Sequence, residues 1–281
     1  MNLEKDDSTN SRENQISLIF TSAHLSQKLI QLEQEANDIE QLCLGSSHAE
    51  NIFSPHIFDR GFNFGCANQD LYYSNRLAQD LIKRLPRLKK IFLIYSIFSP
   101  TWDLTLSRRQ CIHARAFRDI CGINPHWCKT KTKRKLEKGC FRELYNKYMS
   151  SGFISYMPIP KAPIGIGSEK RAHSHLRWSE RKNVNPFMLK YLESFLRTYA
   201  KEYDIIIACA PARSDYIKHL GSIDLLFEKT RKISEVNGAK FYNFLGDTSF
   251  KDDMFLDWDH IDPSSNGPAE FKQRLSKHDL A

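Results

Sequence analysis

Short, continuous apolar runs recur along the chain and are separated by longer segments with apolar residues at helical spacing. A short run that carries no polar face is typical of a strand buried on both sides, as in a parallel sheet. The runs that predict strands are residues 38–44, 90–95, 204–210 and 240–244. The chain is therefore expected to form a mainly parallel sheet.

The segments between these runs predict the helices that would cover the sheet. Their apolar residues recur every three or four positions, so that each segment would present one apolar face. Helices are predicted at residues 16–36, 70–84, 185–201 and 225–237. Alternation of strands and helices favours a three-layer α/β/α sandwich.

The first 37 residues differ from those that follow. Residues 1–14 are polar and charged, which predicts a loosely held tail, and residues 16–36 predict an amphipathic helix that packs on the sheet. We assign residues 1–37 to this tail and helix, and residues 38–281 to one α/β domain. No apolar run approaches the roughly 20 residues of a membrane-spanning helix, and the polar N-terminus lacks the apolar core of a secretory signal.

The most informative stretch is the end of the first predicted strand, where the apolar run stops at Gly45-Ser46-Ser47-His48. Glycine allows a tight turn, and open α/β sheets place their sites at the carboxyl ends of strands. A serine at this point becomes a nucleophile only when a base takes its proton. His260 is the candidate base. Asp257 stands three residues before it, a spacing that lets the carboxylate reach the imidazole and fix its tautomer.

Two further residues compete for these roles. Asp259 also precedes His260, but an adjacent residue is poorly placed to reach the imidazole ring. His48 directly follows Ser47, and we interpret it as part of the site wall instead of as the base.

Together the two segments resemble the first and last motif blocks of the SGNH (GDSL-like) hydrolase superfamily. Gly45-Ser46-Ser47 stands where that family has Gly-Asp-Ser, and Asp257-x-x-His260 fits its Asp-x-x-His unchanged. The resemblance covers roughly residues 38–105 and 200–277. It implies a flavodoxin-like sheet and serine acyl chemistry, with Ser47, His260 and Asp257 as the triad.

The same resemblance implies where an oxyanion would be stabilised. The family's second block, Asn-x-x-x-x-Gly, begins here at Asn63 and puts Asn68 at the glycine position, where asparagine tolerates a left-handed backbone. The amides of Ser47 and Asn68 are the expected donors. The family's third block supplies a further Asn, which this sequence lacks, and Ser96 or Ser99 would donate in its place.

That departure raises the expectation of acyl transfer, or of an inactive site, relative to ordinary ester hydrolysis. The segment from Ser99 to Trp102 is similar to the D-alanyl transfer proteins of teichoic-acid assembly.

Residues 107–182 have a different composition and are interpreted as a basic, largely helical insertion. They hold eighteen Lys and Arg against five Asp and Glu, a net charge of +13, whereas the whole chain carries +8. Such a patch raises the local concentration of anions, for example an acidic glycan, a CoA-type donor or nucleic acid; a solvated face is the alternative. Aromatic residues interleave the charges, as on nucleic-acid-binding surfaces: Trp127, Phe141, Tyr145, Tyr148 and Trp178.

Seven cysteines are scattered through the chain. An odd number in a long chain fits a reducing, cytoplasmic setting better than a disulfide framework. The insertion holds Cys-x-His and His-x-Cys pairs, but zinc sites usually need Cys-x-x-Cys-like pairs that converge on one ion. We therefore expect most of these cysteines to be small buried apolar residues, and we predict no metal and no cofactor. The pairs and their neighbours are Cys111, His113, Cys121, His126, Cys128, Cys140, His173 and His175.

These features favour a serine-dependent ester hydrolase or O-acyltransferase. Its expected partner is an acylated carbohydrate or glycoconjugate, with an acidic one favoured by the basic insertion. Arg213, which follows the run at 204–210, is a candidate contact for an anionic group. Two alternatives stay open: a binding or scaffold protein whose altered site no longer turns over, and a nucleic-acid-binding protein that uses the insertion.

Overall fold

The structure is a computed structural model that describes residues 5–107, 110–125, 160–179 and 188–279. By its internal contacts the chain divides into two units. One consists of residues 1–34 and 103–158, and the other of residues 35–102 and 159–281. All the residues of the candidate site described below belong to the second unit.

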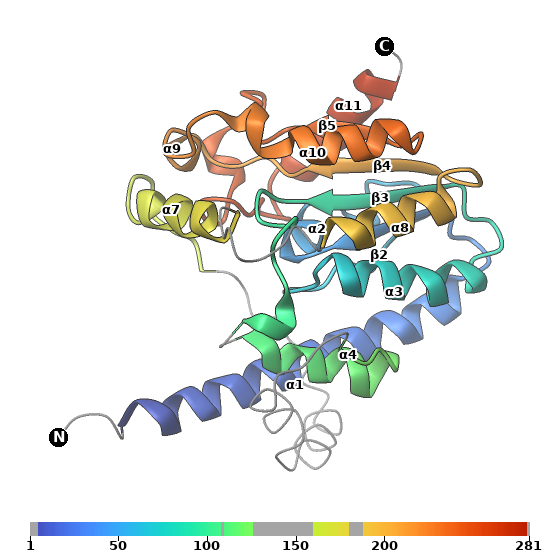
Figure 1. Ribbon diagram of the computed structural model, residues 1–281, viewed down its shortest axis with the longest axis horizontal. Helices are drawn as coiled ribbons and strands as arrows, with labels where there is room; N and C mark the ends of the chain where they lie inside the picture. Colours follow the sequence, from blue (N-terminus) through green and yellow to red (C-terminus); the bar gives the residue numbers. More distant parts are fainter. Residues whose placement is uncertain (1–4, 108–109, 126–159, 180–187, 280–281) are drawn as a thin grey trace. The chain divides into compact units, whose positions relative to one another are not determined.

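The second unit is built on a five-stranded parallel sheet with the order β2-β1-β3-β4-β5, the flavodoxin-like order. Figure 1 shows β3 and β4 side by side and pointing the same way. The prediction of a mainly parallel α/β sheet is confirmed. The strands are β1 (Gln41–Gly45), β2 (Gly61–Asn63), β3 (Lys90–Tyr95), β4 (Asp204–Cys209) and β5 (Lys240–Asn243).

Register places the ends of the central strands together. Gly45, at the end of β1, pairs with Ile94 of β3, and Ile94 pairs in turn with Ala208 of β4. The loops that follow these three strands therefore leave the sheet at one edge. The strand order reverses between β1 and β3, and ligands of open α/β sheets bind outside the carboxyl ends at such a switch point.

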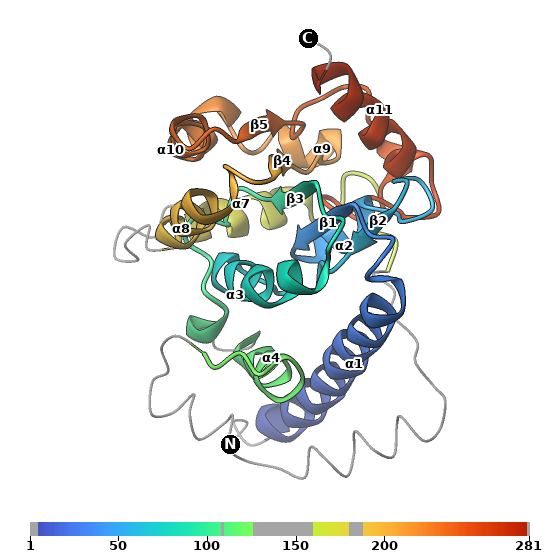
Figure 2. The ribbon, with the colours of Figure 1, turned by 90° about the vertical axis from the view of Figure 1, so that its right-hand side faces the viewer.

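Helices cover both faces of the sheet, as the predicted three-layer sandwich requires. Cys43, Phe92 and Ile206 point to the face covered by α2 (Ser47–Ile52) and α11 (Gly267–Asp279). On the opposite face Tyr95 packs on Phe227 of α10 (Ile223–Val236), and α10 contacts α8 (Leu189–Tyr199), which contacts α3 (Leu71–Leu81). Figure 2 shows α3, α8 and α10 on one side of the sheet and α11 on the other.

The remaining helical segments of this unit are short or lie near the ends of the strands. They are α7 (Ser168–Ser179), α9 (Ser214–Ile217) and the 3-10 turns η1 (Ile82–Arg84) and η4 (Asp252–Met254). Helix α7 contacts α9 and contributes two side chains to the candidate site.

The first unit contains α1 (Lys5–Glu35), α4 (His113–Cys121) and the 3-10 turns η2 (Leu104–Leu106) and η3 (Gln110–Ile112). Helix α1 begins at Lys5, so the tail predicted for residues 1–14 is wrong from that residue onward. Within this unit buried His113 contacts the hydroxyl of Thr21 at 2.8 Å and that of Ser17 at 3.3 Å. None of the helices in the described ranges combines the length and the apolar character needed to cross a bilayer.

The described parts of the predicted insertion are helical where they are regular, in η3, α4 and α7. Its most basic stretch, Lys129–Lys138, lies outside the described residues, as do Arg108, Arg109 and the segment at 180–182. The same holds for the aromatic residues Trp127, Phe141, Tyr145 and Tyr148. Nucleic-acid binding through this insertion therefore stays a prediction.

Candidate active site

The turn after β1 presents two serines at the edge of the sheet. Gly45 has a φ of +140°, and a Cβ on it would lie 2.6 Å from the carbonyl oxygen of Ile94. Only glycine meets both conditions. Ser46 then occupies the N-cap position, and Ser47 is the first residue of α2.

Ser47 contacts the predicted base. Its Oγ lies 2.8 Å from Nε2 of His260, a residue 213 positions later in the chain. On the other side of the ring, Nδ1 of His260 lies 2.9 Å from Oδ1 and 3.0 Å from Oδ2 of Asp257. The carboxylate can only accept, so Nδ1 carries the proton and Nε2 is free to accept one from Ser47. The predicted proximity of these three side chains is confirmed.

Asp257 also shapes the loop on which His260 stands. Its Oδ1 accepts hydrogen bonds from the backbone N–H of Asp259 at 3.0 Å and of His260 at 2.9 Å. Phe255 and Ile261 form an isolated antiparallel bridge that closes the loop at its base. One carboxylate therefore fixes both the backbone and the tautomer of the histidine.

The charges around His260 favour its protonated form. Burial alone would lower the pKa of His260, but the carboxylates of Asp259 and Asp257 outweigh burial and raise it. Burial would likewise raise the pKa of Asp257, but its hydrogen bond and ion pair with His260 lower that pKa. The site thus stabilises an imidazolium next to an anionic aspartate, as a general base requires after it has taken a proton.

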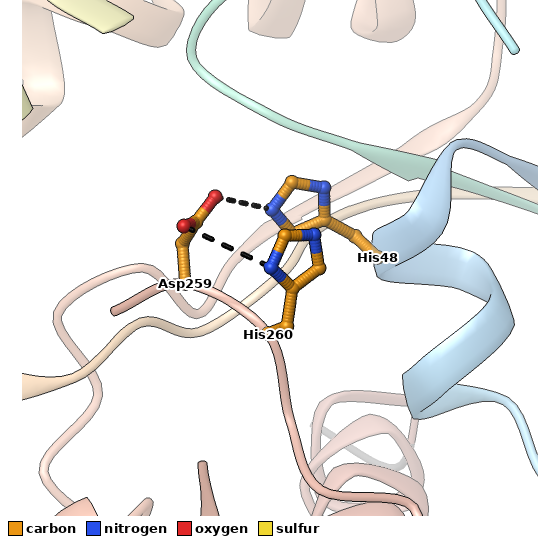
Figure 3. Close-up of side chains that lie close together, drawn as sticks. All are labelled: His48, Asp259 and His260. Carbon is orange, nitrogen blue, oxygen red and sulfur yellow. Dashed lines mark hydrogen bonds and ion pairs between the residues drawn. The ribbon is translucent and has the colours of Figure 1, made fainter. Parts of the chain in front are cut away.

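A second set of hydrogen bonds lies against the first, and Figure 3 shows two of its members, His48 and Asp259, beside His260. His48 contacts Oγ of Ser46 through Nδ1 at 3.1 Å and Oδ2 of Asp259 through Nε2 at 3.0 Å. Arg171 of α7 donates to both oxygens of Asp259, at 3.0 and 3.4 Å. His48 does not take the place of His260 at Ser47, in agreement with its interpretation as a wall residue.

Sequence reasoning did not find the part that Asp259, Arg171 and His175 play in this second set. The sequence suggests Asp259 only as a partner of His260, but its Oδ1 is 3.9 Å from Nδ1 of that residue, too far for a hydrogen bond. His175, also on α7, contacts the hydroxyl of Tyr216 at 2.7 Å and lies 3.8 Å from Asp259. No local spacing in the sequence links α7 to residue 259.

Asn68 has the left-handed backbone that its place in the sequence motif led us to expect. Its φ is +66°, in the left-handed region. The preceding residues continue alongside β1, because the N–H of Cys66 donates to the carbonyl of Gly45 at 3.0 Å. Asn68 therefore lies in a turn beside the strand that leads to Ser47. Asn63 has a structural part, since its side-chain amide donates to the carbonyls of Ala49 and Phe53 in and after α2.

Ser96 and Ser99 form a turn at the end of β3. The N–H of Ser96 donates to Oγ of Ser99 at 3.0 Å, and the two hydroxyls lie 3.1 Å apart. Ser96 lines a small cavity with His48 and Asp259, behind the second set of hydrogen bonds. The structure thus gives both hydroxyls partners within the turn.

Arg213 has a different setting from the predicted anion contact. Its side chain is 1% exposed and forms an ion pair with Asp215 through Nε at 2.6 Å and Nη2 at 2.9 Å. Nη1 donates to the carbonyl of Ala162, and Nη2 also donates to that of Pro163. Since these donors are engaged within the protein, Arg213 fastens the 162–163 segment to the loop after β4.

Among the described residues, His48, Asp259 and His260 form the group whose atoms come closest to a metal-binding arrangement, within 4.8 Å of one another. The donor set does not fit an ion well. Asp259 pairs with the Arg171 cation, and both nitrogens of His260 face other partners. Of the zinc ligands considered from the sequence, Cys111 is buried and His113 and His175 contact hydroxyl groups. His126, Cys128 and Cys140 lie outside the described ranges.

Comparisons with known proteins add little to this geometry. No family model matches the chain, and no curated protein matches it. A solved structure described as a candidate platelet activating factor from Streptococcus pneumonia is similar with 12% identity and a TM-score of 0.46, over 96% of this chain and 98% of that one. A likeness this distant leaves the assignment of function to the site itself.

Proposed function

We propose that the protein is a serine-dependent ester hydrolase or O-acyltransferase of the SGNH type. The observation that carries the proposal is the continuous contact from Ser47 through His260 to Asp257. Two segments that are far apart in the sequence supply the parts: the turn after β1 supplies the nucleophile, and the loop that holds Asp257 and His260 supplies the base and its orienting carboxylate. They meet at the carboxyl edge of a parallel sheet, where this fold places its sites.

In the proposed first step, Ser47 Oγ attacks the ester carbonyl while Nε2 of His260 takes the serine proton. The imidazolium is stabilised by Asp257, and it then gives the proton to the leaving alkoxide when the ester C–O bond breaks. In the second step, water or an acceptor hydroxyl attacks the acyl-Ser47 ester with His260 again as base. Ser47 recovers its proton when the acyl group leaves, so that hydrolysis and transfer differ only in the acceptor.

The tetrahedral intermediates need donors for their oxyanion. The N–H of Ser47, at the first position of α2, has no acceptor within its helix, because helices leave their first N–H groups unsatisfied. The N–H of Asn68, in its left-handed turn, is the proposed second donor. A side-chain donor in place of the family's third-block Asn is not supported by the turn in which Ser96 and Ser99 engage each other.

For the substrate we retain an acylated carbohydrate or glycoconjugate. The positive charge of the insertion supports an acidic one, because a basic segment attracts anions. Arg213 is left out of this proposal, since its guanidinium is committed to Asp215 and to backbone carbonyls.

The test compares the wild type with Ser47→Ala on p-nitrophenyl acetate and on acetylated sugars, at one enzyme concentration. We expect loss of turnover on the order of 10⁴-fold or more. We also expect loss of covalent labelling by a fluorophosphonate probe. Ser276→Ala is the matched control, because it removes the same hydroxyl from an exposed position of α11.

Equal hydrolysis, transfer and labelling by the wild type and Ser47→Ala would refute the proposal. The scaffold alternative would then replace it. If the wild type itself shows no turnover although these contacts are present, the protein is a binding protein on this fold.

A further inference from the structure

Arg171, Asp259 and His48 form a connected second network that the proposed mechanism does not use. Asp259 is 4% exposed, and Arg171 approaches both of its carboxylate oxygens. Burial would raise the pKa of Asp259, but the positive charge of Arg171, with further help from its histidine neighbours, lowers that pKa well below its usual range. Asp259 is therefore a buried anion with a fixed place.

The anion sets the tautomer of His48. A carboxylate accepts hydrogen bonds only, so Nε2 of His48 carries the proton and donates to Oδ2 of Asp259 at 3.0 Å. Nδ1 then accepts from the hydroxyl of Ser46, at 3.1 Å. With both nitrogens engaged, the ring of His48 cannot rotate without breaking a hydrogen bond.

The fixed ring of His48 lies against that of the candidate base. The two imidazoles are stacked, with centroids 4.7 Å apart and planes 18° from parallel (Figure 3). Burial lowers the pKa of His48. The neutral ring therefore supports His260 from one side without repelling the positive charge that His260 acquires during the reaction.

Asp259 interacts with His260 through its charge, because it lies too far from the ring to form a hydrogen bond. Its Oδ1 is 3.9 Å from Nδ1 of His260, in an interior where charges are weakly screened. The two carboxylates thus have different roles. Asp257 forms hydrogen bonds with the ring of His260 and with the backbone of its loop. Asp259 places a negative charge near that ring and holds His48 by a hydrogen bond.

We infer that Asp259 and His48 are positioning residues for His260, held in place by Arg171: His48 fixes the plane of the imidazole and Asp259 stabilises its protonated form. The expected effect of these residues on catalysis rests on the proposed function. Their effect on the protonation of His260 can be measured in a protein that turns nothing over. Within the described residues, the charged and titratable groups that face His260 or its neighbours come from four elements: His48 from α2, Arg171 and His175 from α7, Tyr216 from α9, and Asp257 and Asp259 from its own loop.

The first experiment titrates the ring protons of His260 by NMR in the full chain, with the resonance assigned by its absence in His260→Gln. Asp259→Asn keeps the shape of the side chain and removes its charge. We expect the pKa of His260 to fall by roughly one unit or more, the usual effect of losing an opposite charge at this distance. Asp253→Asn is the control, because it removes an exposed negative charge from the segment that leads to the loop.

An unchanged pKa in Asp259→Asn, in a protein that still folds, would overturn the electrostatic part of the inference. A repeat in the Ser47→Ala background separates the two proposals. If Ser47→Ala leaves turnover intact, the proposed function fails, and the shift in the pKa of His260 still decides the role of Asp259.

The second experiment tests the ring contact by comparing His48→Phe with His48→Ala. Phenylalanine keeps a flat ring against His260 but forms none of the hydrogen bonds of His48. We expect His48→Ala to lower kcat by up to about 10²-fold with little change in KM, because the base loses its orientation. His48→Phe should recover most of that loss. Equal kcat values for the two variants, measured per folded molecule, would show that His48 is only structural.

Discussion

Replacing Asp257 by Asn should separate the fixing of the histidine tautomer from the folding of the loop. Oδ1 of Asp257 accepts from the backbone N–H groups of Asp259 and His260, and an asparagine oxygen can keep both hydrogen bonds. The asparagine NH₂ would then occupy the place of Oδ2, 3.0 Å from Nδ1 of His260. Nδ1 also lies 2.9 Å from Oδ1, but that oxygen already accepts from the two backbone N–H groups. Since two donors cannot face each other, we expect Nδ1 to become the acceptor for the asparagine NH₂ and the ring proton to move to Nε2, facing Ser47.

A histidine in that tautomer cannot take the proton of Ser47. We therefore expect Asp257→Asn to lower kcat by about 10⁴-fold, or about 5 kcal/mol of barrier, while the protein remains nearly as stable as the wild type. Asp257→Ala removes the acceptor as well. Leaving two buried N–H groups unsatisfied costs about 1–3 kcal/mol each, so its free energy of unfolding should fall by roughly 2–6 kcal/mol.

Ester hydrolysis under single-turnover conditions measures the first effect, and urea unfolding measures the second. The reasoning is refuted if Asp257→Asn keeps a tenth or more of the wild-type kcat, since the carboxylate would then not set the tautomer. It is also refuted if Asp257→Asn and Asp257→Ala destabilise the protein equally, since the hydrogen bonds from the backbone N–H groups would then contribute nothing to stability.

Two further predictions concern pH. Asp259 and Asp257 raise the pKa of His260, and catalysis needs the neutral ring, so kcat/KM should fall at acid pH with a midpoint above pH 6.5. A midpoint at or below pH 6.5 would contradict the assignment of His260 as the base. Burial lowers the pKa of His113 from 6.5 to about 4, so the unfolded chain takes up a proton first as the pH falls. The free energy of unfolding should then drop by up to about 3 kcal/mol between those values, and less in His113→Asn; parallel acid-unfolding curves would disprove this.

The sheet could be predicted from the sequence wherever a strand is buried on both faces. The runs at 90–95 and 204–210 consist almost wholly of apolar residues and contain β3 and β4. β2 consists only of Gly61–Asn63 and lies at the edge of the sheet. A strand this short does not form an apolar run that could be recognised in the sequence. The predicted helix at 16–36 begins too late, because α1 begins at Lys5. Residues 5–15 are polar, but a polar segment can still continue a helix.

In the candidate site, the sequence predicted the contacts that depend on short spacings. Asp257 and His260 are three residues apart on one loop, and the Gly45 turn locates Ser47 at a strand end. The ion pair of Arg213 with Asp215 also has a local signal, two opposite charges two residues apart. Because of this ion pair, the arginine is unavailable to a substrate although it follows a strand at the carboxyl edge of the sheet.

What could not be predicted is the network around Asp259, because its partners come from distant parts of the chain. Arg171 is 88 residues away and His48 is 211 residues away. The rule that an adjacent carboxylate cannot orient a histidine ring holds for His260, but it says nothing of what that carboxylate meets on its other side. Since Asp257 alone satisfies Nδ1 of His260, the second carboxylate and its arginine are not needed to complete a triad. Burying the carboxylate of Asp259 next to the base costs free energy through desolvation, which the ion pair with Arg171 offsets. Because this pair is not needed to bind Nδ1 of His260, we explain it by its effect on the protonation of His260.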